Sequence, residues 1–280
     1  MNATHRPTVE PSTSPDEPLS PELESVAAAL RDLRTTAPPR VRDATLVALG
    51  LADAYARFDS PIGPVAVAWN GRGVSAVVRA SGAGGVARSL EAEVGRRVVG
   101  PAEPPPSLAR RIAARLAGDR RVRLPVDLRS RSPFDQAVLR KALEIPSGEV
   151  RPYAWIATEI GRPRAVRAVG SALRRNPVPL LVPCHRVVRS DGRIGEYSLG
   201  GPETKRALLS HEGVDVTELE RLALAGVRFV GSRTTRIVCL PTCHNARRID
   251  TPNRVPFRSL GEGIRAGFRP CRECRPASAA

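Results

Sequence analysis

The pattern of apolar and polar positions predicts a mixed α/β protein. Val65-Ala66-Val67-Ala68-Trp69 is a run of strand-forming residues, and Asn70-Gly71 after it is a strong hairpin signal. Residues 74–78 then form the expected return strand, and residues 108–117 have the spacing of an amphipathic helix. Together these elements indicate a small α/β domain.

Helical patterns dominate the next part of the chain. Ser132-Pro133-Phe134-Asp135 has the residues of a helix start, so a helix is expected from there to about residue 144. Two short helices should follow, over about 153–161 and 163–176, joined by a turn that contains glycine. This arrangement is typical of a helix-turn-helix. The second helix has few bulky side chains, which would let it approach DNA closely; tight packing on a neighbouring helix is the alternative, and both stay open.

The net charge of the chain indicates the kind of partner that it binds. The 280 residues include 44 Lys and Arg against 28 Asp and Glu, a net charge of +16. Such a balance predicts attraction to nucleic acid first and to anionic membranes second, although heavy use of arginine alone could also produce it. No apolar run approaches the roughly 20 residues that span a bilayer, and the polar N-terminus has no signal-peptide core. We therefore expect a cytoplasmic protein that does not enter membranes.

The cysteines are divided between two places. Of the five, Cys184 stands alone and four lie near the C-terminus; in a cytosolic protein, cysteines more often serve catalysis or metal binding than disulfides. His185 follows Cys184 directly and could act as its base. A Cys-His pair alone is more often structural, but here a basic helix-turn-helix precedes it. Glu212 offers a carboxylate to orient the histidine, which completes a nucleophile, a base and an orienting acid.

The residues around Cys184 resemble a known family. The matching segments, within residues 134–213, are Arg167-Ala168-Val169-Gly170, Asn176-Pro177-Val178-Pro179, Pro183-Cys184-His185-Arg186-Val187, Gly195-Glu196-Tyr197-Ser198 and His211-Glu212-Gly213. This part of the chain resembles the C-terminal domain of the O6-alkylguanine-DNA alkyltransferases. Residues 55–130 resemble the N-terminal domain of that family more weakly. The resemblance implies a ribonuclease-H-like α/β subdomain followed by an α-helical, winged-helix-like alkyltransferase domain.

The resemblance also implies an activity and a set of roles. Cys184 would accept a methyl or alkyl group from O6-alkylguanine, or from O4-alkylthymine, in double-stranded DNA, in one irreversible turnover by a monomer. His185 would deprotonate Cys184 through a water, and Glu212 would orient His185. Tyr153 would protonate the leaving guanine, and Asn176 would be the hinge before the active-site segment. The implied DNA contacts are Arg167, Ala168, Gly170, Ser171, Arg174 and Arg186, with Arg167 filling the gap left by the flipped nucleotide, and the implied pocket residues are Val187, Tyr197 and Ser198. A non-enzymatic sensor of alkylated DNA is the alternative, but the acceptor cysteine with its partners favours the enzyme.

The C-terminal cysteines form two closely spaced pairs, Cys239 with Cys243 and Cys271 with Cys274. Two such pairs indicate a tetrahedral zinc site, for one Zn²⁺ ion. Disulfides are the alternative, and His244 is a competing candidate ligand.

Residues 228–276 resemble the zinc domain of the adaptive-response (Ada) regulator. The match includes Arg233-Thr234-Thr235, Ile237, Pro241, residues 266–271, Cys274-Arg275-Pro276 and the four cysteines. The resemblance implies a small α+β fold. It also implies that Cys239, the first of the four, accepts methyl from DNA phosphotriesters. A purely structural zinc site is the competing hypothesis, and both stay open.

The domain organisation that follows has these boundaries: a disordered tail over 1–22, a helical extension over 23–54, the N-terminal α/β domain over 55–130, the DNA-binding catalytic domain over 131–215, a linker over 216–226, the zinc domain over 227–276 and a tail over 277–280.

Overall fold

A computed structural model of the chain describes residues 20–32, 37–80, 85–119 and 121–277. The chain divides into two compact units, Met1–Arg42 and Asp43–Ala280. The first unit contains helix α1 (Pro21–Asp32) and the start of helix α2 (Pro39–Leu49). The predicted tail over 1–22 falls almost entirely outside the described residues. All the features discussed below lie in the second unit.

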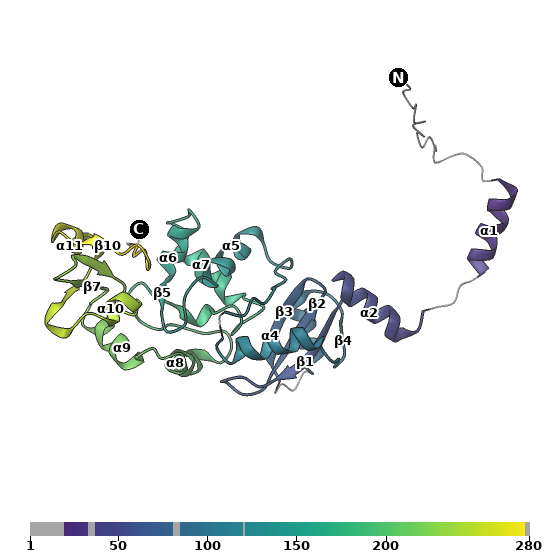
Figure 1. Ribbon diagram of the computed structural model, residues 1–280, viewed down its shortest axis with the longest axis horizontal. Coiled ribbons are helices and arrows are strands. Elements are labelled where there is room, and N and C mark those ends of the chain that lie inside the picture. Colours follow the sequence, from purple (N-terminus) through teal and green to yellow (C-terminus); the bar gives the residue numbers. More distant parts are fainter. Residues whose placement is uncertain (1–19, 33–36, 81–84, 120, 278–280) are drawn as a thin grey trace, which may run out of the picture. The chain divides into compact units, whose positions relative to one another are not determined.

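A four-stranded sheet forms the first part of this unit, the N-terminal sheet region (Figure 1). Its elements are β1 (Asp53–Phe58), β2 (Val65–Asn70), β3 (Gly73–Arg79), β4 (Val98–Val99), α3 (Val86–Val94) and α4 (Pro106–Leu116). The strand order is β3-β2-β1-β4, with only β4 parallel to its neighbour. The predicted hairpin is confirmed as β2 and β3, which are antiparallel and meet at the pair Asn70 and Gly73.

Every residue of β2 is buried, because helices cover both faces of the sheet. Val65 and Val67 pack in a cluster with Ile112 of α4, whereas Ala66 and Ala68 pack in a second cluster with residues of α3. Burial on both faces explains why the strand is a continuous apolar run instead of an alternating one.

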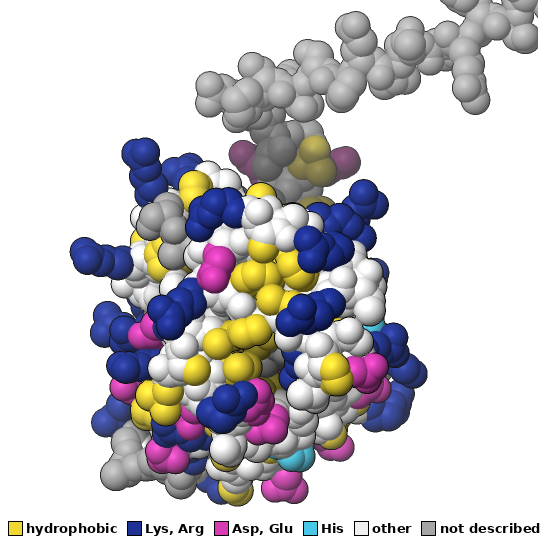
Figure 2. Space-filling model, turned by 90° about the vertical axis from the view of Figure 1, so that its left-hand side faces the viewer, with side chains coloured by type: hydrophobic (Ala, Val, Ile, Leu, Met, Phe, Trp, Pro, Cys, Tyr) yellow, Lys and Arg dark blue, Asp and Glu magenta, His cyan; other side chains and the backbone are white. Residues whose placement is uncertain are grey.

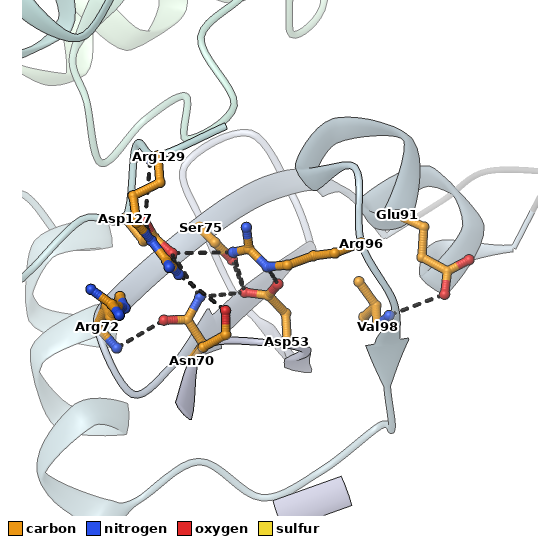
Figure 3. Close-up of polar contacts among 10 residues, drawn as sticks. Asp53, Asn70, Arg72, Ser75, Glu91, Arg96, Val98, Asp127 and Arg129 are labelled. Atoms are coloured by element: carbon orange, nitrogen blue, oxygen red, sulfur yellow. Dashed lines mark hydrogen bonds and ion pairs between the residues drawn. The ribbon is translucent and has the colours of Figure 1, made fainter. Parts of the chain in front are cut away.

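A buried polar network holds one end of the sheet to the next part of the chain (Figure 3). The Asn70 amide donates to Asp53 at 2.8 Å and to Asp127 at 2.9 Å, and Arg96 pairs with both carboxylates. Burial alone would raise the pKa of Asp127, but hydrogen bonds from Arg129 and Asn70 outweigh it and hold that pKa well below its usual range. Buried carboxylates are tolerated only when paired in this way, so the network fixes the segment that leads to α5.

The next part, residues 131–215, is the helical region. It contains α5 (Pro133–Ala142), β5 (Arg151–Pro152), α6 (Tyr153–Glu159), α7 (Val166–Arg174), the 3-10 helix η1 (Cys184–Arg186), β6 (Val187–Val188) and α8 (Gly201–His211). The predicted helix start is confirmed, since the Ser132 hydroxyl accepts from the Asp135 N–H at 3.1 Å. α6 and α7 follow one another as predicted for a helix-turn-helix, although α7 begins three residues after Pro163. β5 and β6 pair in parallel and join distant parts of this region.

Residues 227–276 form the C-terminal module. A second sheet in the order β10-β8-β7-β9 holds it together, with α10 and α11 packed on β7 (Figure 1). Its elements are β7 (Phe229–Ser232), β8 (Ile237–Cys239), α10 (His244–Arg247), the 3-10 helix η2 (Thr251–Asn253), β9 (Arg254–Phe257), α11 (Leu260–Arg265) and β10 (Arg269–Pro270). Gly231 has to be glycine because a Cβ there would lie 2.6 Å from the Phe268 ring and 2.7 Å from the Phe257 ring.

Residues 216–226, predicted as a linker, contain helix α9 (Val216–Leu224). The Asp215 side chain caps it by accepting from the Glu218 N–H at 2.9 Å, and Leu219 and Ala223 are buried. The segment between the helical region and the C-terminal module is therefore a capped, packed helix. The coarse expectation of mixed α/β structure is confirmed, and among the described residues no helix has the length and apolar character needed to cross a bilayer.

Candidate active site and metal centre

Cys184 is the first residue of η1, and its side chain is buried. The Asn176 amide donates to the Cys184 Sγ at 3.1 Å and to the Val182 carbonyl at 3.1 Å, while its oxygen accepts from the Val178 N–H. Asn176 thus fixes both the approach to the cysteine and the thiol itself. Leu180, within this approach, has a φ of 70°, which is strained backbone for a non-glycine residue.

Behind Cys184, the next two residues converge on one carboxylate. The His185 Nε2 lies 3.1 Å from the Glu212 Oε1, and Arg186 donates to both oxygens of Glu212 at 2.6 and 2.7 Å. Burial alone would raise the pKa of Glu212, but hydrogen bonds from His185 and Arg186 outweigh it and hold that pKa well below its usual range. Glu212 is therefore an anion that can fix the tautomer of His185, leaving Nδ1 as the basic nitrogen.

The thiol of Cys184 does not ionise easily by itself. Burial raises its pKa, while the hydrogen bond from Asn176 and the charge of Lys205 act in the opposite direction. Lys205 was not among the predicted site residues. It is 1% exposed, its Nζ donates to the Val187 carbonyl at 2.6 Å and the Glu196 carbonyl at 3.3 Å, and burial lowers its pKa to about 8. A buried thiol in this setting needs a base to become a nucleophile.

A pocket of about 340 Å³ opens onto the Cys184 side chain. Its lining is drawn from α6, α7, η1 and the loop before α8, and consists of Tyr153, Gly170, Leu173, Arg174, Cys184, Glu196, Tyr197 and Ser198. Burial raises the pKa of Tyr153, and the nearby Cys184 raises it further, so the phenol keeps its proton at neutral pH. The pocket thus combines a nucleophile, a proton donor and two further polar residues, Tyr197 and Ser198.

Helix α7 turns a smooth, basic face outward beside this pocket. Val169, Ala172 and Leu173 are buried against the core, whereas Arg167, Ala168 and Arg174 are exposed and Gly170 and Ser171 are partly exposed. The small residues of α7 thus serve different faces: Ala172 packs inward, and Ala168 leaves the outer face free of bulk. An exposed face of this kind can approach a nucleic acid closely.

The structure places two of the predicted site residues in the core. Arg186, predicted to contact DNA, is 1% exposed and bound to Glu212 and to the Ile145 carbonyl, so its guanidinium cannot reach a partner at the surface. Val187, predicted to line the pocket, is fully buried in strand β6 and lies outside the lining. Both residues directly follow the buried pair Cys184 and His185 in and after η1, and their side chains pack in the core.

The four clustered cysteines meet in the C-terminal module. The sulfur atoms of Cys239, Cys243, Cys271 and Cys274 all lie within 4.8 Å of one another, and all four side chains are buried. Thiolates about 2.3 Å from a tetrahedral Zn²⁺ have a similar separation, so the donor set fits zinc. The thiols are free, which is contrary to the disulfide alternative. His244 instead pairs with Glu273 at 3.4 Å, outside this cluster.

N–H groups reach some of these sulfur atoms but not all. The Leu240 N–H donates to Cys274 at 3.4 Å and the Asn245 amide donates to Cys271 at 3.6 Å. The backbone N–H groups of Asn245 and Ala246 act on Cys243 in the same direction, since they lower its pKa. Within the described residues, Cys239 receives no such donor, so it differs electrostatically from the other three.

The C-terminal module is also basic at its surface. Figure 2 shows Lys and Arg side chains around a central group of hydrophobic side chains, on the face where β7, β10 and α11 lie in Figure 1. Arg233, Arg236, Arg265 and Arg269 are among the exposed arginines of this module. Such a surface attracts polyanions.

Two family models match the chain. The model described as 6-O-methylguanine DNA methyltransferase, DNA binding domain, matches residues 133–214, and the model described as the metal binding domain of Ada matches residues 220–277.

Curated relatives and solved structures show the same similarity. A methylated-DNA-protein-cysteine methyltransferase of Methanosarcina acetivorans is 37% identical over 162 residues, which are 57% of this chain and 97% of that protein. The rat protein of the same name is 48% identical over 100 residues, covering 35% of this chain and 46% of the relative. The crystal structure of Mycobacterium tuberculosis OGT in complex with DNA is 32% identical, covers 59% of this chain and 98% of its own, and has a TM-score of 0.46. The chain spans less than half the length of its mammalian relatives.

Proposed function

Because the chain belongs to the methylated-DNA-protein-cysteine methyltransferase family, we propose that it repairs double-stranded DNA by moving an alkyl group from the O6 atom of guanine, or the O4 atom of thymine, to Cys184. The observation that carries this proposal is the pocket in which Cys184, Tyr153, Tyr197 and Ser198 meet, beside the exposed face of α7. A single monomer would contain every group that the reaction needs.

In this reaction the Cys184 Sγ attacks the alkyl carbon, a sulfur–carbon bond forms and the carbon–O6 bond breaks. The thiol proton passes to His185, and Glu212 stabilises the resulting imidazolium. The guanine oxygen is a poor leaving group unless the ring gains a proton as it departs, and the protonated Tyr153 can supply it. The thioether product is stable, so each molecule acts once.

The target atom lies inside the base stack, so the nucleotide must turn out of the duplex. We propose that α7 binds DNA through Arg167, Ala168, Gly170, Ser171 and Arg174, with Asn176 as the hinge that leads from it to Cys184. Arg167 is exposed and can enter the vacated space, which offsets part of the unstacking cost of a few kcal/mol. The small side chain of Ala168 keeps this face of the helix close to the groove.

Finer parts of the fold belong to the same proposal. We take residues 55–130 as a ribonuclease-H-like subdomain and residues 131–215 as the winged-helix-like, DNA-binding catalytic domain, followed by the zinc domain over 227–276. The parallel pair β5 and β6 and the two consecutive helices α6 and α7 support the second assignment.

The direct test uses duplex DNA with a labelled methyl group on guanine O6. Wild-type protein should become labelled with one methyl per molecule at most, and Cys184→Ala should stay unlabelled while still binding the duplex. Arg140→Ala, at an exposed position on α5, is the control for altered surface charge. A wild-type protein that binds the damaged duplex but gains no label would support the sensor alternative instead.

A second candidate function is methyl transfer from a DNA phosphotriester to Cys239. Hydrogen bonds to an anion stabilise it and weaken it as a nucleophile, so the absence of an N–H donor to Cys239 among the described residues favours this sulfur over the other three. Zinc, when bound by the four cysteines, keeps thiols deprotonated at neutral pH. The 1% exposure of Cys239 favours the structural role instead.

Methylphosphotriester DNA separates the two roles of the zinc site. If Cys239 is an acceptor, Cys184→Ala should still gain label from this DNA and the double variant with Cys239→Ala should not. If Cys184→Ala gains no label although it contains zinc in full, the zinc site has a structural role only.

A further inference from the structure

The loop between the first two cysteines of the zinc site lies against the helical region. The Thr242 hydroxyl accepts from the Val150 N–H at 2.9 Å and donates to the Val150 carbonyl at 3.4 Å. Both residues are buried, although 92 positions separate them in the chain. One side chain of the C-terminal module thus satisfies both backbone groups of Val150, and a buried backbone group left without a partner costs about 1–3 kcal/mol.

The other side of Cys243 is held to the same segment. The His244 N–H, directly after Cys243, donates to the Glu149 Oε1 at 3.1 Å. The other oxygen of Glu149 accepts from Arg151 at 2.6 Å, and Glu149 is itself buried. Both neighbours of this zinc-site cysteine therefore bind residues 149–150, so the position of the cysteine loop and that of the segment are linked.

Residues 149–152 lead directly into the proposed acceptor site. Arg151 and Pro152 form β5, which pairs in parallel with Val187 and Val188 of β6, and β6 directly follows η1 with Cys184. Tyr153, the proposed proton donor, begins α6 immediately after β5. A small displacement of β5 would therefore move the nucleophile and the proton donor together.

A second set of contacts reaches α6 from the residue after Cys274. The Arg275 Nη2 lies 2.8 Å from the Glu159 Oε2 and 3.6 Å from the Glu144 Oε2. Its guanidinium lies 5.7 Å from the centre of the Trp155 ring, a buried residue of α6. Residues next to the zinc-site cysteines thus contact both the segment just before β5 and helix α6, which begins at Tyr153.

From these contacts we infer that the C-terminal module positions the Cys184 site, with Thr242 as the positioning residue, so that metal binding by the four cysteines controls the rate of alkyl transfer from guanine. This inference rests on the proposed function. The zinc site then has a role in guanine repair whether or not Cys239 accepts a methyl group.

Thr242→Val tests the inference because it removes the hydroxyl while keeping the shape and leaving the zinc-site cysteines in place. At saturating O6-methylguanine duplex, well below the melting temperature, we expect a single-turnover rate constant about 10-fold lower, with the half-saturating DNA concentration and the zinc content unchanged. Thr242→Ser, which keeps a hydroxyl group, should transfer the alkyl group at the wild-type rate. Thr251→Val, at an exposed position of the same module, is the matched control. Wild-type transfer by Thr242→Val would overturn the inference, whereas absence of transfer by the wild type would instead contradict the proposed function.

Hydrogen–deuterium exchange gives a readout that does not depend on transfer. Removing zinc from the full chain with a chelator should speed exchange in peptides that cover residues 149–153 and 184–188, and leave β1 to β3 unchanged. Loss of zinc with unchanged protection of both segments would contradict the coupling, even if the C-terminal module itself unfolds.

Discussion

Cys184 and the zinc-site cysteines are all buried free thiols, yet their surroundings differ in kind. Cys184 stands alone, and burial raises its pKa, so its reactivity depends on Asn176, His185 and Glu212 around it. The four clustered sulfur atoms can instead be stabilised as thiolates by one metal ion that they bind together. The contrast shows that burial of a cysteine says little about its role until the groups that could stabilise its anion are known.

The largest effect is expected from Glu212→Gln, which tests whether Cys184 depends on the groups around it. It should lower alkyl transfer by about 10³-fold or more, because His185 loses the anion that fixes its tautomer and stabilises its protonated form. It should also cost about 3 kcal/mol of stability, because buried Arg186 loses its partner. Single-turnover transfer and urea unfolding measure the two effects.

The free energy of unfolding at acid pH provides a second test of Glu212. Its pKa in the folded state lies below the ordinary value of 4.5, so its contribution to stability is complete above that value and is lost as the pH falls further. Wild type should therefore lose stability below about pH 4.5 more steeply than Glu212→Gln. Glu103→Gln, which removes an exposed carboxylate, is the control and should keep the wild-type profile. Equal transfer by Glu212→Gln and wild type would show that Cys184 does not depend on this carboxylate.

A smaller effect is expected from Tyr153→Phe, which changes the pocket and leaves the groups behind Cys184 intact. Loss of the phenol proton should slow transfer by about 10²-fold at saturating DNA. Thermal stability and zinc content should not change. Tyr55→Phe in the N-terminal sheet region removes a phenol away from the pocket and should react as wild type. An unchanged rate for Tyr153→Phe would mean that the leaving guanine takes its proton from another source.

Arg167→Ala separates the chemistry at Cys184 from access to it. Because Arg167 is exposed on α7 and would occupy the gap in the duplex, its loss should slow transfer from duplex DNA by about 10-fold. Transfer from the free base should be unaffected, since no nucleotide has to be displaced. Arg140→Ala controls for the loss of one positive charge. Equal slowing on both substrates would place Arg167 in the chemical step.

Local signals in the sequence predicted the parts of the molecule that local chemistry determines. Asn70-Gly71 marked the hairpin, Ser132 marked the start of α5, and the spacing of Cys239, Cys243, Cys271 and Cys274 indicated the metal site. Each of these signals lies in a short stretch of sequence, so a single sequence is enough to find it.

Features that depend on distant pairing could not be predicted in this way. The burial of Arg186 follows from its contacts with Glu212 and Ile145, and the contact between Thr242 and Val150 spans 92 positions. The network around Asp53 and Asp127 is equally non-local. One signal for Lys205 was present in the sequence: it is one of only two lysines in a chain whose other basic residues are arginines.

Lys205 affects stability and not the chemical step, and it bears on how the lone cysteine is supported. Burial lowers its pKa to about 8 from an ordinary 10.5, so between these values the unfolded chain holds a proton that the folded chain does not. Stability should therefore rise with pH across this window, by at most about 1.4 kcal/mol per pH unit from this one group. Lys205→Met should flatten the rise in urea unfolding, while Lys141→Met, whose amino group pairs with Glu144, should retain it. If both variants keep the wild-type slope, Lys205 carries the same charge in the folded and the unfolded chain. Its amino group would then act on Cys184 as a positive charge at every pH in this range.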